Sequence, residues 1–210
     1  MIHLYTWGTP NGRKISIMLE EVALPYQVVP IDISKNKQFE PGYLAINPNN
    51  KIPAIVDDEN GQSLFESGAI LLYLAEKSGK LLPKSAADKW QVMQWLMWQM
   101  AGQGPMLGQA HHFLQFNPGI SEYAENRYLQ EAERLYGVLD KQLEQQRFVA
   151  IDELTIADIA IWPWVSRYQF QKIDLHNYSN ILEWYLRLAK RPAFQAGYQV
   201  PDAKQEIVIP

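Results

Sequence analysis

Strand-like segments occur only in the first third of this chain, and every later patterned segment is helical. The segments from Ile2 to Trp7 and from Gln27 to Ile33 are typical of strands. Between them, the segment from Gly12 to Val22 has apolar residues that recur on one helical face. A strand, a helix and a second strand in this order predict a parallel pair of strands.

A hairpin and a further helix follow. Residues 54–57 and 63–65 are strand-like and flank Glu59-Asn60-Gly61, and the dipeptide Asn-Gly is a strong signal for a hairpin turn. Ser67 is then expected to cap a helix that ends near Ser78-Gly79. Because the hairpin pairs its strands antiparallel, the four strands together predict a mixed sheet.

The pattern changes after Leu82-Pro83, where Gly79, Pro83 and Ser85 indicate a linker. Helical patterns then cover residues 86–113, 121–145, 155–169 and 178–190. We therefore predict an α+β domain over residues 1–81 and an all-α domain over residues 86–210. The polar tail after Phe194 either covers another part of the protein or is loose.

The composition excludes several classes of function. The chain has no cysteine, which removes disulfide scaffolds, cysteine-ligated zinc and a protein thiol nucleophile. A net charge of −4 gives no reason to expect nucleic acid as a partner, because phosphate binding needs a concentrated basic surface. The sequence has no run of about eighteen apolar residues, so no membrane span is expected. The first residues do not have the pattern of a secretory signal. We expect a cytoplasmic protein.

The segment from Asn47 to Asp57 has two prolines and three asparagines before a β-branched strand. The Ile52-Pro53 bond lies where a loop becomes that strand, a position that tolerates proline. A cis bond there would turn the backbone N–H and C=O of Ile52 outward, toward an extended peptide. Most bonds that precede proline are trans, so an ordinary trans proline remains the alternative.

Glu66 and Ser67 lie at the predicted start of a helix. The Ser67 hydroxyl and the first free N–H groups of the helix would attract a carboxylate, and Glu66 could pair with an ammonium group. A ligand with both groups at one end has the head group of an α-amino acid. The alternative is that Ser67 is a simple helix cap.

The turn from Trp7 to Lys14 follows the first strand. Its glycines are too few for a phosphate loop. Thr9 and Asn11 offer small polar groups at a helix start, where they could donate hydrogen bonds to an anion such as a thiolate. An ordinary helix start would have the same residues.

These segments resemble a known family. Asn47–Asp57, followed by Glu66–Ile70, resembles the glutathione-site signature of the glutathione S-transferases. Leu154–Ala160 resembles the capping motif of their helical domain. Finer similarity, in Thr9–Gly12, Asn49–Ile55 and Gly104–Gln109, is to the bacterial nu class, known as glutathione-dependent disulfide-bond oxidoreductases with weak transferase activity.

The resemblance implies a thioredoxin-like N-terminal domain, with element order β-α-β-α-β-β-α, followed by an all-helical domain. It also implies a cis Ile52-Pro53 bond and roles for individual residues. Ile52 would pair with the cysteinyl part of glutathione, Glu66 and Ser67 would hold its γ-glutamyl end, Gln38 and Lys51 would lie near its glycyl end, and Thr9 and Asn11 would face its sulfur. Arg127 would reach glutathione from the helical domain, or it is a solvated charge.

Many classes of the family set a Tyr, Ser or Cys beside the sulfur. In this chain Tyr5 is expected in the core, there is no Cys, and no Ser lies in the first turn, so stabilisation of the thiolate is left to Thr9, Asn11 and the helix N-terminus. The predicted function is a homodimeric enzyme that reduces small disulfides with bound glutathione thiols. The alternatives are a transferase or peroxidase acting on electrophiles or organic hydroperoxides, and a non-enzymatic glutathione-binding regulatory module. No metal is expected, since His111 and His112 are adjacent and point apart on a helix. Asp158 has capping-box spacing from Thr155 and is expected to be structural.

Overall fold

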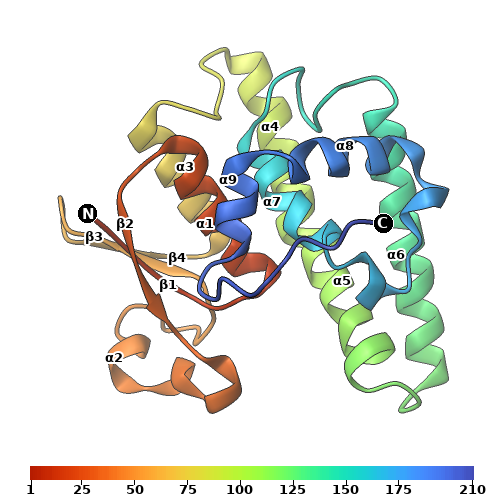
Figure 1. Cartoon of the computed structure of the whole chain (residues 1–210), viewed down its shortest axis with the longest axis horizontal. Coiled ribbons are helices and arrows are strands. Elements are labelled where there is room, and N and C mark those ends of the chain that lie inside the picture. The colour runs from red at the N-terminus through yellow and green to blue at the C-terminus, as the bar shows by residue number, and fades with distance from the viewer. The chain divides into compact units, whose positions relative to one another are not determined.

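The computed structural model describes residues 1–210, and its first 78 residues have the predicted order of strands and helices (Figure 1). The α+β part consists of β1 (Ile2–Thr6), α1 (Pro10–Val22), β2 (Tyr26–Pro30), the 3-10 turns η1 (Ile33–Lys35) and η2 (Lys37–Phe39), α2 (Pro41–Leu44), β3 (Ala54–Asp57), β4 (Gln62–Phe65) and α3 (Ser67–Ser78). The sheet has the order β2-β1-β3-β4. β1 pairs parallel to β2 and antiparallel to β3, and β3 pairs antiparallel to β4, so the predicted mixed sheet is confirmed.

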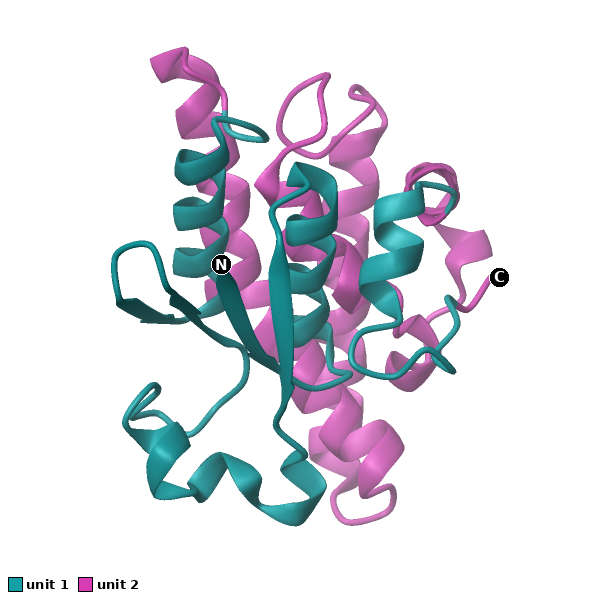
Figure 2. Cartoon of the chain, turned by 60° about the vertical axis from the view of Figure 1, so that its left-hand side comes forward, with its two compact units in different colours: residues 1–82, 190–207 teal, residues 83–189, 208–210 magenta.

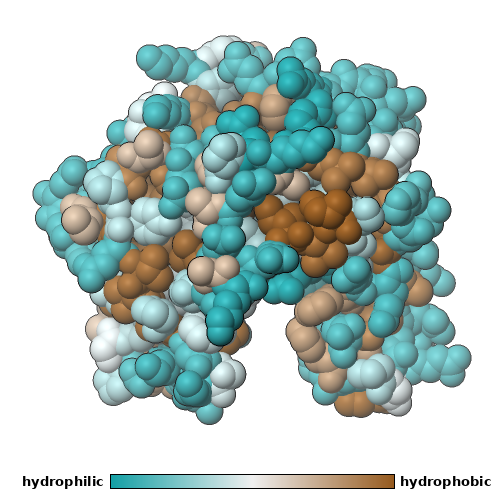
Figure 3. Space-filling view, viewed as in Figure 1, coloured by the Kyte–Doolittle hydropathy of each residue, from teal (hydrophilic) through white to brown (hydrophobic).

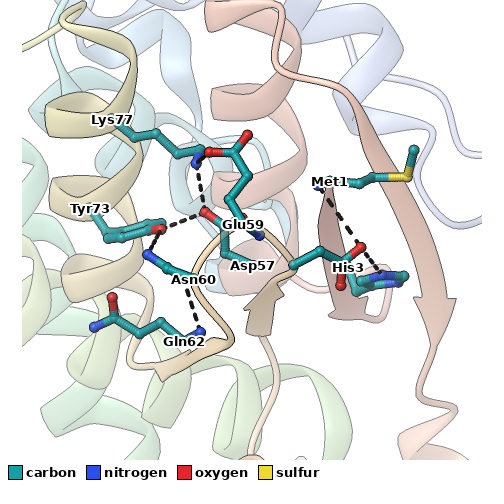
Figure 4. Close-up of polar contacts among 9 residues, drawn as sticks. Met1, His3, Asp57, Glu59, Asn60, Gln62, Tyr73 and Lys77 are labelled. Carbon is teal, nitrogen blue, oxygen red and sulfur yellow. Dashed lines mark hydrogen bonds and ion pairs between the residues drawn. The ribbon is translucent and has the colours of Figure 1, made fainter.

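A buried carboxylate ties the β3–β4 hairpin to α3 (Figure 4). Asp57 Oδ2 lies 2.8 Å from Lys77 Nζ and accepts a hydrogen bond of 2.5 Å from the Tyr73 hydroxyl, while Oδ1 accepts one of 3.0 Å from the Glu59 amide. Burial alone would raise the pKa of Asp57, but the hydrogen bonds from Lys77, Tyr73 and Glu59 outweigh it and lower the pKa to about 2. The hairpin turn itself ends at Gly61, whose positive φ of 69° fits the predicted Asn-Gly turn.

The division of the chain into two compact units requires one correction to the predicted domains. One unit contains residues 1–82 and 190–207, and the other contains residues 83–189 and 208–210 (Figure 2). Most of the tail therefore belongs with the α+β part and not with the helical one. Helical periodicity shows that one face of a segment is buried, but it does not show which core receives that face.

The contacts of α9 (Pro192–Tyr198) with α1 explain this placement. A Cβ atom at Gly197 would lie 2.5 Å from the backbone nitrogen of Ile17, so only glycine permits this approach. Ser16 Oγ donates a hydrogen bond of 2.6 Å to the carbonyl oxygen of Gly197. Arg191 binds Glu21 through two hydrogen bonds, of 2.6 and 2.8 Å.

The helical unit begins with one continuous run from Ala86 to Phe116. It contains α4 (Ala86–Trp98), the π-helical segment η3 (Gln99–Gln103), α5 (Gly104–Ala110) and the π-helical segment η4 (His111–Phe116). α6 (Glu122–Leu143), α7 (Ile156–Val165), the 3-10 turns η5 (Tyr168–Gln171) and η6 (Leu175–Asn177), and α8 (Ser179–Ala189) follow. The predicted helix over residues 155–169 is thus two elements, because α7 ends at Val165 and the chain continues as 3-10 turns. No helix combines the length and apolar character needed to cross a membrane.

The predicted capping box at the start of α7 is present. Asp158 is fully buried, and its Oδ2 accepts hydrogen bonds from the backbone nitrogen and the hydroxyl of Thr155 at 3.0 and 3.1 Å. Its Oδ1 accepts further bonds from the Val149 amide at 2.9 Å and the Trp184 indole at 3.0 Å. Asp158 therefore joins the loop before α7 to α8, as well as capping its own helix.

Candidate functional site

Three connections of the α+β unit meet at one edge of its sheet. In the strand register, Ala54 of β3 lies between Tyr5 of β1 and Phe65 of β4. β1 and β4 end near these positions and β3 begins there, so the β1–α1 turn, the loop before β3 and the β4–α3 junction lie side by side. These connections carry Thr9 and Asn11, Lys51 to Pro53, and Glu66 and Ser67, respectively.

The β1–α1 turn is tightly folded and presents the start of a helix. Thr9 is the N-cap of α1, and its Oγ1 accepts a hydrogen bond of 3.2 Å from the Gly12 amide. A Cβ atom at Gly12 would overlap the carbonyl oxygen of Trp7. Asn11 is half-buried in the first turn of α1. The positive end of the helix and two small polar side chains thus converge here, which favours an anion.

Side-chain hydrogen bonds fix the loop before β3. Lys51 O accepts bonds of 2.6 Å from Asn47 Nδ2 and 2.5 Å from the Tyr43 hydroxyl, and Asn47 Oδ1 accepts one of 2.9 Å from the Asn49 amide. Burial raises the pKa of Tyr43 to about 12, so the hydroxyl remains a donor at neutral pH.

The Ile52-Pro53 bond is cis, as the family resemblance implies. The side chain of Ile52 packs against the cluster formed by Ile31, Tyr43 and Ala54. Its backbone lies outside the sheet, because the β3 ladder begins at Ala54, and it forms no other backbone hydrogen bond. The N–H and C=O groups of Ile52 are therefore available to a peptide-like ligand.

The β4–α3 junction differs in one detail from the prediction. Glu66, and not Ser67, is the N-cap of α3, and it has an unusual φ of 71° with a ψ of 112°. Ser67 is the first helical residue and is buried. A hydroxyl at that position is already within the helix, and Ser67 Oγ instead accepts a hydrogen bond of 3.2 Å from Lys14 Nζ. Backbone strain at a non-glycine residue such as Glu66 is typical of functional sites.

Lys14 is a candidate site residue because it donates a hydrogen bond to Ser67, and the sequence did not identify it. Only 1% of Lys14 is exposed, and burial lowers its pKa from 10.5 to about 7 against the opposing field of Glu66. Helical spacing could have identified it, since Lys14 precedes the core residue Met18 by four positions and shares its face. A cation on the apolar face of a helix is unusual enough to deserve a functional hypothesis.

Gln38 lies in η2, on the connection between β2 and β3. Its Oε1 atom is buried and has no hydrogen-bond partner within the chain. A buried polar atom without a partner costs about 1–3 kcal/mol, and a ligand can supply the missing bond. Lys51, the other residue expected near the glycyl end, is exposed.

Arg127 belongs to the helical unit, whereas the other predicted site residues belong to the α+β unit. It is exposed on α6 and lines a hollow of about 560 Å³, together with Met106, Tyr123, Asn126, Tyr128, Gln130 and Glu131. The mixture of aromatic, amide and charged groups suits a polar ligand with an apolar portion.

Two further predictions concern residues outside the site. Tyr5 lies in β1 and packs against the core residue Tyr43 with 6.1 Å between ring centres, but it is only partly buried, so it lies at the margin of the core that was expected to contain it. His111 is buried and lies 3.0 Å from Gln171 Nε2, and burial with the charge of Arg167 lowers its pKa to about 4. No group of three or more His, Cys, Asp or Glu side chains is arranged to hold a metal ion.

Comparison with known proteins identifies the family. Residues 1–76 match the family described as glutathione S-transferase, N-terminal domain, and residues 122–187 match glutathione S-transferase, C-terminal domain. The chain is 50% identical over 198 residues to disulfide-bond oxidoreductase YfcG of Escherichia coli (strain K12), covering 92% of each protein. It is 43% identical over 212 residues to disulfide-bond oxidoreductase YghU of the same organism, covering 93% of this chain and 73% of that protein.

Solved structures agree with this relationship. A glutathione transferase from Pseudomonas putida, with one glutathione disulfide bound per subunit, has a TM-score of 0.90 and 43% identity, covering 95% of this chain and 91% of the other. A glutathione transferase from Burkholderia graminis, with two glutathione molecules bound per subunit, has a TM-score of 0.90 and 40% identity, covering 95% and 88%. The α+β unit thus has the thioredoxin-like fold, and the chain belongs to the glutathione S-transferase family.

Proposed function

We propose that this protein is a nu-class, glutathione-dependent disulfide reductase that uses bound glutathione thiols and no protein cysteine. The observation that carries the proposal is that a chain without cysteine is 50% identical to a disulfide-bond oxidoreductase. Both reacting thiols must then come from small molecules. The glutathione disulfide bound in one related structure and the two glutathione molecules bound per subunit in another support this reading.

In the proposed complex, one glutathione lies along the sheet edge. Its cysteinyl backbone pairs with Ile52, which precedes Pro53, its γ-glutamyl head group meets Glu66 and Ser67, and its glycyl end lies near Gln38 and Lys51. The free backbone groups of Ile52 and the buried Gln38 Oε1 support these assignments. The sulfur then faces Thr9 and Asn11 at the start of α1.

The reaction proceeds by two exchange steps. The bound thiolate attacks one sulfur of the substrate disulfide, forming a mixed disulfide as the substrate S–S bond breaks and one thiolate leaves. A second glutathione thiolate then attacks the glutathione sulfur of that mixed disulfide, which releases the second substrate thiol and forms glutathione disulfide. Two glutathione molecules are oxidised for each disulfide reduced.

The thiolate needs stabilisation because a free thiol has a pKa of about 8.5. Each unit by which the pKa falls requires about 1.4 kcal/mol of preference for the thiolate. One charge-assisted hydrogen bond contributes about 1.5–3 kcal/mol, so one donor at Thr9 or Asn11 accounts for one to two units. We propose Arg127 as the group that contacts the glutathione pair from the helical unit.

Paired steady-state assays at matched glutathione concentrations test the proposal. The protein is expected to reduce hydroxyethyl disulfide far faster than it conjugates a chloronitrobenzene. Fast conjugation without disulfide turnover would favour a transferase acting on electrophiles, a function supported by the glutathione transferase names of the related structures. Binding of glutathione without any of these reactions would favour a regulatory module. Binding of glutathione with hydroperoxide reduction alone would favour a peroxidase.

We further propose that the protein is a cytoplasmic homodimer. Most of the face shown in Figure 3 is hydrophilic, with apolar side chains gathered in a few places. On α4, Trp90 is 66% exposed and Met97 is 47% exposed, and their seven-residue spacing puts them on one side of the helix. Large apolar side chains exposed together are typical of interfaces.

Sedimentation equilibrium tests the dimer. The wild type should have twice the mass of one chain, and the double variant Trp90→Glu, Met97→Glu should have the mass of one. Ile120→Glu, at an apolar side chain that is 68% exposed elsewhere, is the matched control and should remain dimeric. A monomeric wild type would contradict the proposal.

A further inference from the structure

Lys14 and Ser67 form a buried hydrogen bond between the starts of two helices. Lys14 Nζ donates to Ser67 Oγ at 3.2 Å, and the residues lie 53 positions apart in the chain, on α1 and α3. Lys14 is 1% exposed and Ser67 is 4% exposed. An ammonium group so deep in a unit loses most of its hydration, which is unfavourable unless nearby negative groups compensate for it.

The negative charge of Glu66 offsets only part of the cost of burying Lys14. The field of Glu66 favours the charged form of Lys14, yet burial prevails and the pKa falls to about 7. An apolar side chain of similar length would fill this position at a lower cost in folding free energy. The position of the charge, beside the two residues proposed to hold a γ-glutamyl head group, indicates a role in binding.

We propose that Lys14 is a positioning and specificity residue, whose ammonium group acts through Ser67 to make the site selective for the α-carboxylate of the γ-glutamyl group. This inference rests on the proposed glutathione site. Ser67 Oγ accepts a hydrogen bond from Lys14 Nζ. A hydroxyl that accepts from a cation is a stronger donor to an anion.

Charge balance gives the same result. The α-carboxylate of the bound ligand adds a negative charge near the desolvated ammonium group of Lys14. This charge replaces part of the stabilisation that Lys14 lost when it was removed from water. Glu66, exposed at the N-cap of α3, is left to pair with the ligand's ammonium group. In this arrangement Lys14 and Ser67 complement the carboxylate of an α-amino acid head group, and Glu66 complements its ammonium group.

The test compares two ligands and two lysines by titration calorimetry. The ligands are glutathione and 4-aminobutanoyl-cysteinyl-glycine. This analogue lacks only the α-carboxylate, and its terminal amine keeps the ammonium group of the head group. Lys14→Met should weaken glutathione binding about tenfold or more and change binding of the analogue less than twofold. Lys80→Met is the matched control, because Lys80 Nζ contacts the other end of α1 at Val22 O, and it should leave both affinities unchanged.

A double-mutant cycle tests whether Lys14 acts through Ser67. In a Ser67→Ala background, Lys14→Met should have less than a twofold further effect on glutathione binding. In the disulfide assay, Lys14→Met should raise KM for glutathione about tenfold and leave kcat within twofold. Lys14→Gln, which keeps a donor but not the charge, should lie between wild type and Lys14→Met, and it replaces Lys14→Met if that variant does not fold.

Two outcomes would overturn the inference while leaving the proposed function intact. One is that the wild type binds glutathione and that Lys14→Met and Lys14→Gln bind it with the same affinity. The other is an equal loss of affinity for both ligands, which would indicate a structural role. Failure of the wild type to bind glutathione would instead overturn the proposed function itself.

Discussion

The guanidinium carbon of Arg13 lies 3.5 Å from the centre of the Tyr198 ring. Both side chains are buried, and Arg13 also donates a hydrogen bond to Gln205. The side chain of Gln205 reaches the β1–α1 turn, where a Cβ atom at Gly8 would lie 2.5 Å from its Nε2. The C-terminal segment therefore stabilises the turn that carries Thr9 and Asn11, through a cation–π contact and the packing of α9.

Truncation of Tyr198 tests this support. Tyr198→Ala should lower the free energy of unfolding by about 3 kcal/mol or more, because it removes a buried aromatic ring and its contact with Arg13. Denaturant unfolding provides the measurement. Tyr123→Ala is the control, since Tyr123 is 76% exposed and its loss should change stability by less than about 0.5 kcal/mol. Equal effects of the two substitutions would show that α9 adds little to the unit.

Asp57 should make stability depend on pH in the acid range. Its pKa is about 2 in the folded protein, below the ordinary value of 3.8, so its contribution is present above about pH 4 and is lost as the pH falls toward 2. Asp57→Asn should therefore be less stable than wild type at pH 7, with a difference that shrinks between pH 4 and pH 2. Urea unfolding at several pH values measures this. Asp152→Asn, at an exposed carboxylate, should follow the wild-type curve, and a difference for Asp57→Asn that does not vary with pH would refute the assignment.

Asp158 should matter for stability and not for ligand affinity. Asp158→Ala removes the acceptor for the amides of Val149 and Thr155 and for the Trp184 indole, so a loss of about 3 kcal/mol or more is expected. Thermal unfolding measures the loss, and calorimetry on the folded fraction should give the wild-type affinity for glutathione. Asp174→Ala, which removes an exposed cap of η6, should cost less than about 1 kcal/mol. Stable protein with lost binding would make Asp158 a functional residue.

Asn11 and Thr9 should affect turnover more than binding. If their side chains stabilise the glutathione thiolate, Asn11→Ala should lower kcat for disulfide reduction more than it raises the apparent constant for glutathione. Thr9→Ala should act in the same direction but more weakly. A spectroscopic titration of the bound thiol should show a higher pKa in Asn11→Ala than in wild type. Unchanged turnover in both variants would leave the helix start alone as the stabilising group.

Local sequence determined most of the elements of this protein. Periodicity predicted the four strands and most of the long helices, Asn60-Gly61 predicted the hairpin, and Thr155 with Asp158 predicted the capping box, because each depends on residues that are neighbours in the chain. The residues proposed for the glutathione site came mainly from family resemblance.

Contacts between distant segments required the tertiary structure. The register that aligns Tyr5, Ala54 and Phe65, the bond from Lys14 to Ser67, and the packing of residues 190–207 on α1 join positions far apart in the chain. A helical or strand pattern specifies that a face is buried, but the partner of that face is chosen by packing and hydrogen bonding in the folded unit. For the same reason, the sequence identified Ser67 as a polar group at a helix start, and only the fold paired it with a buried cation.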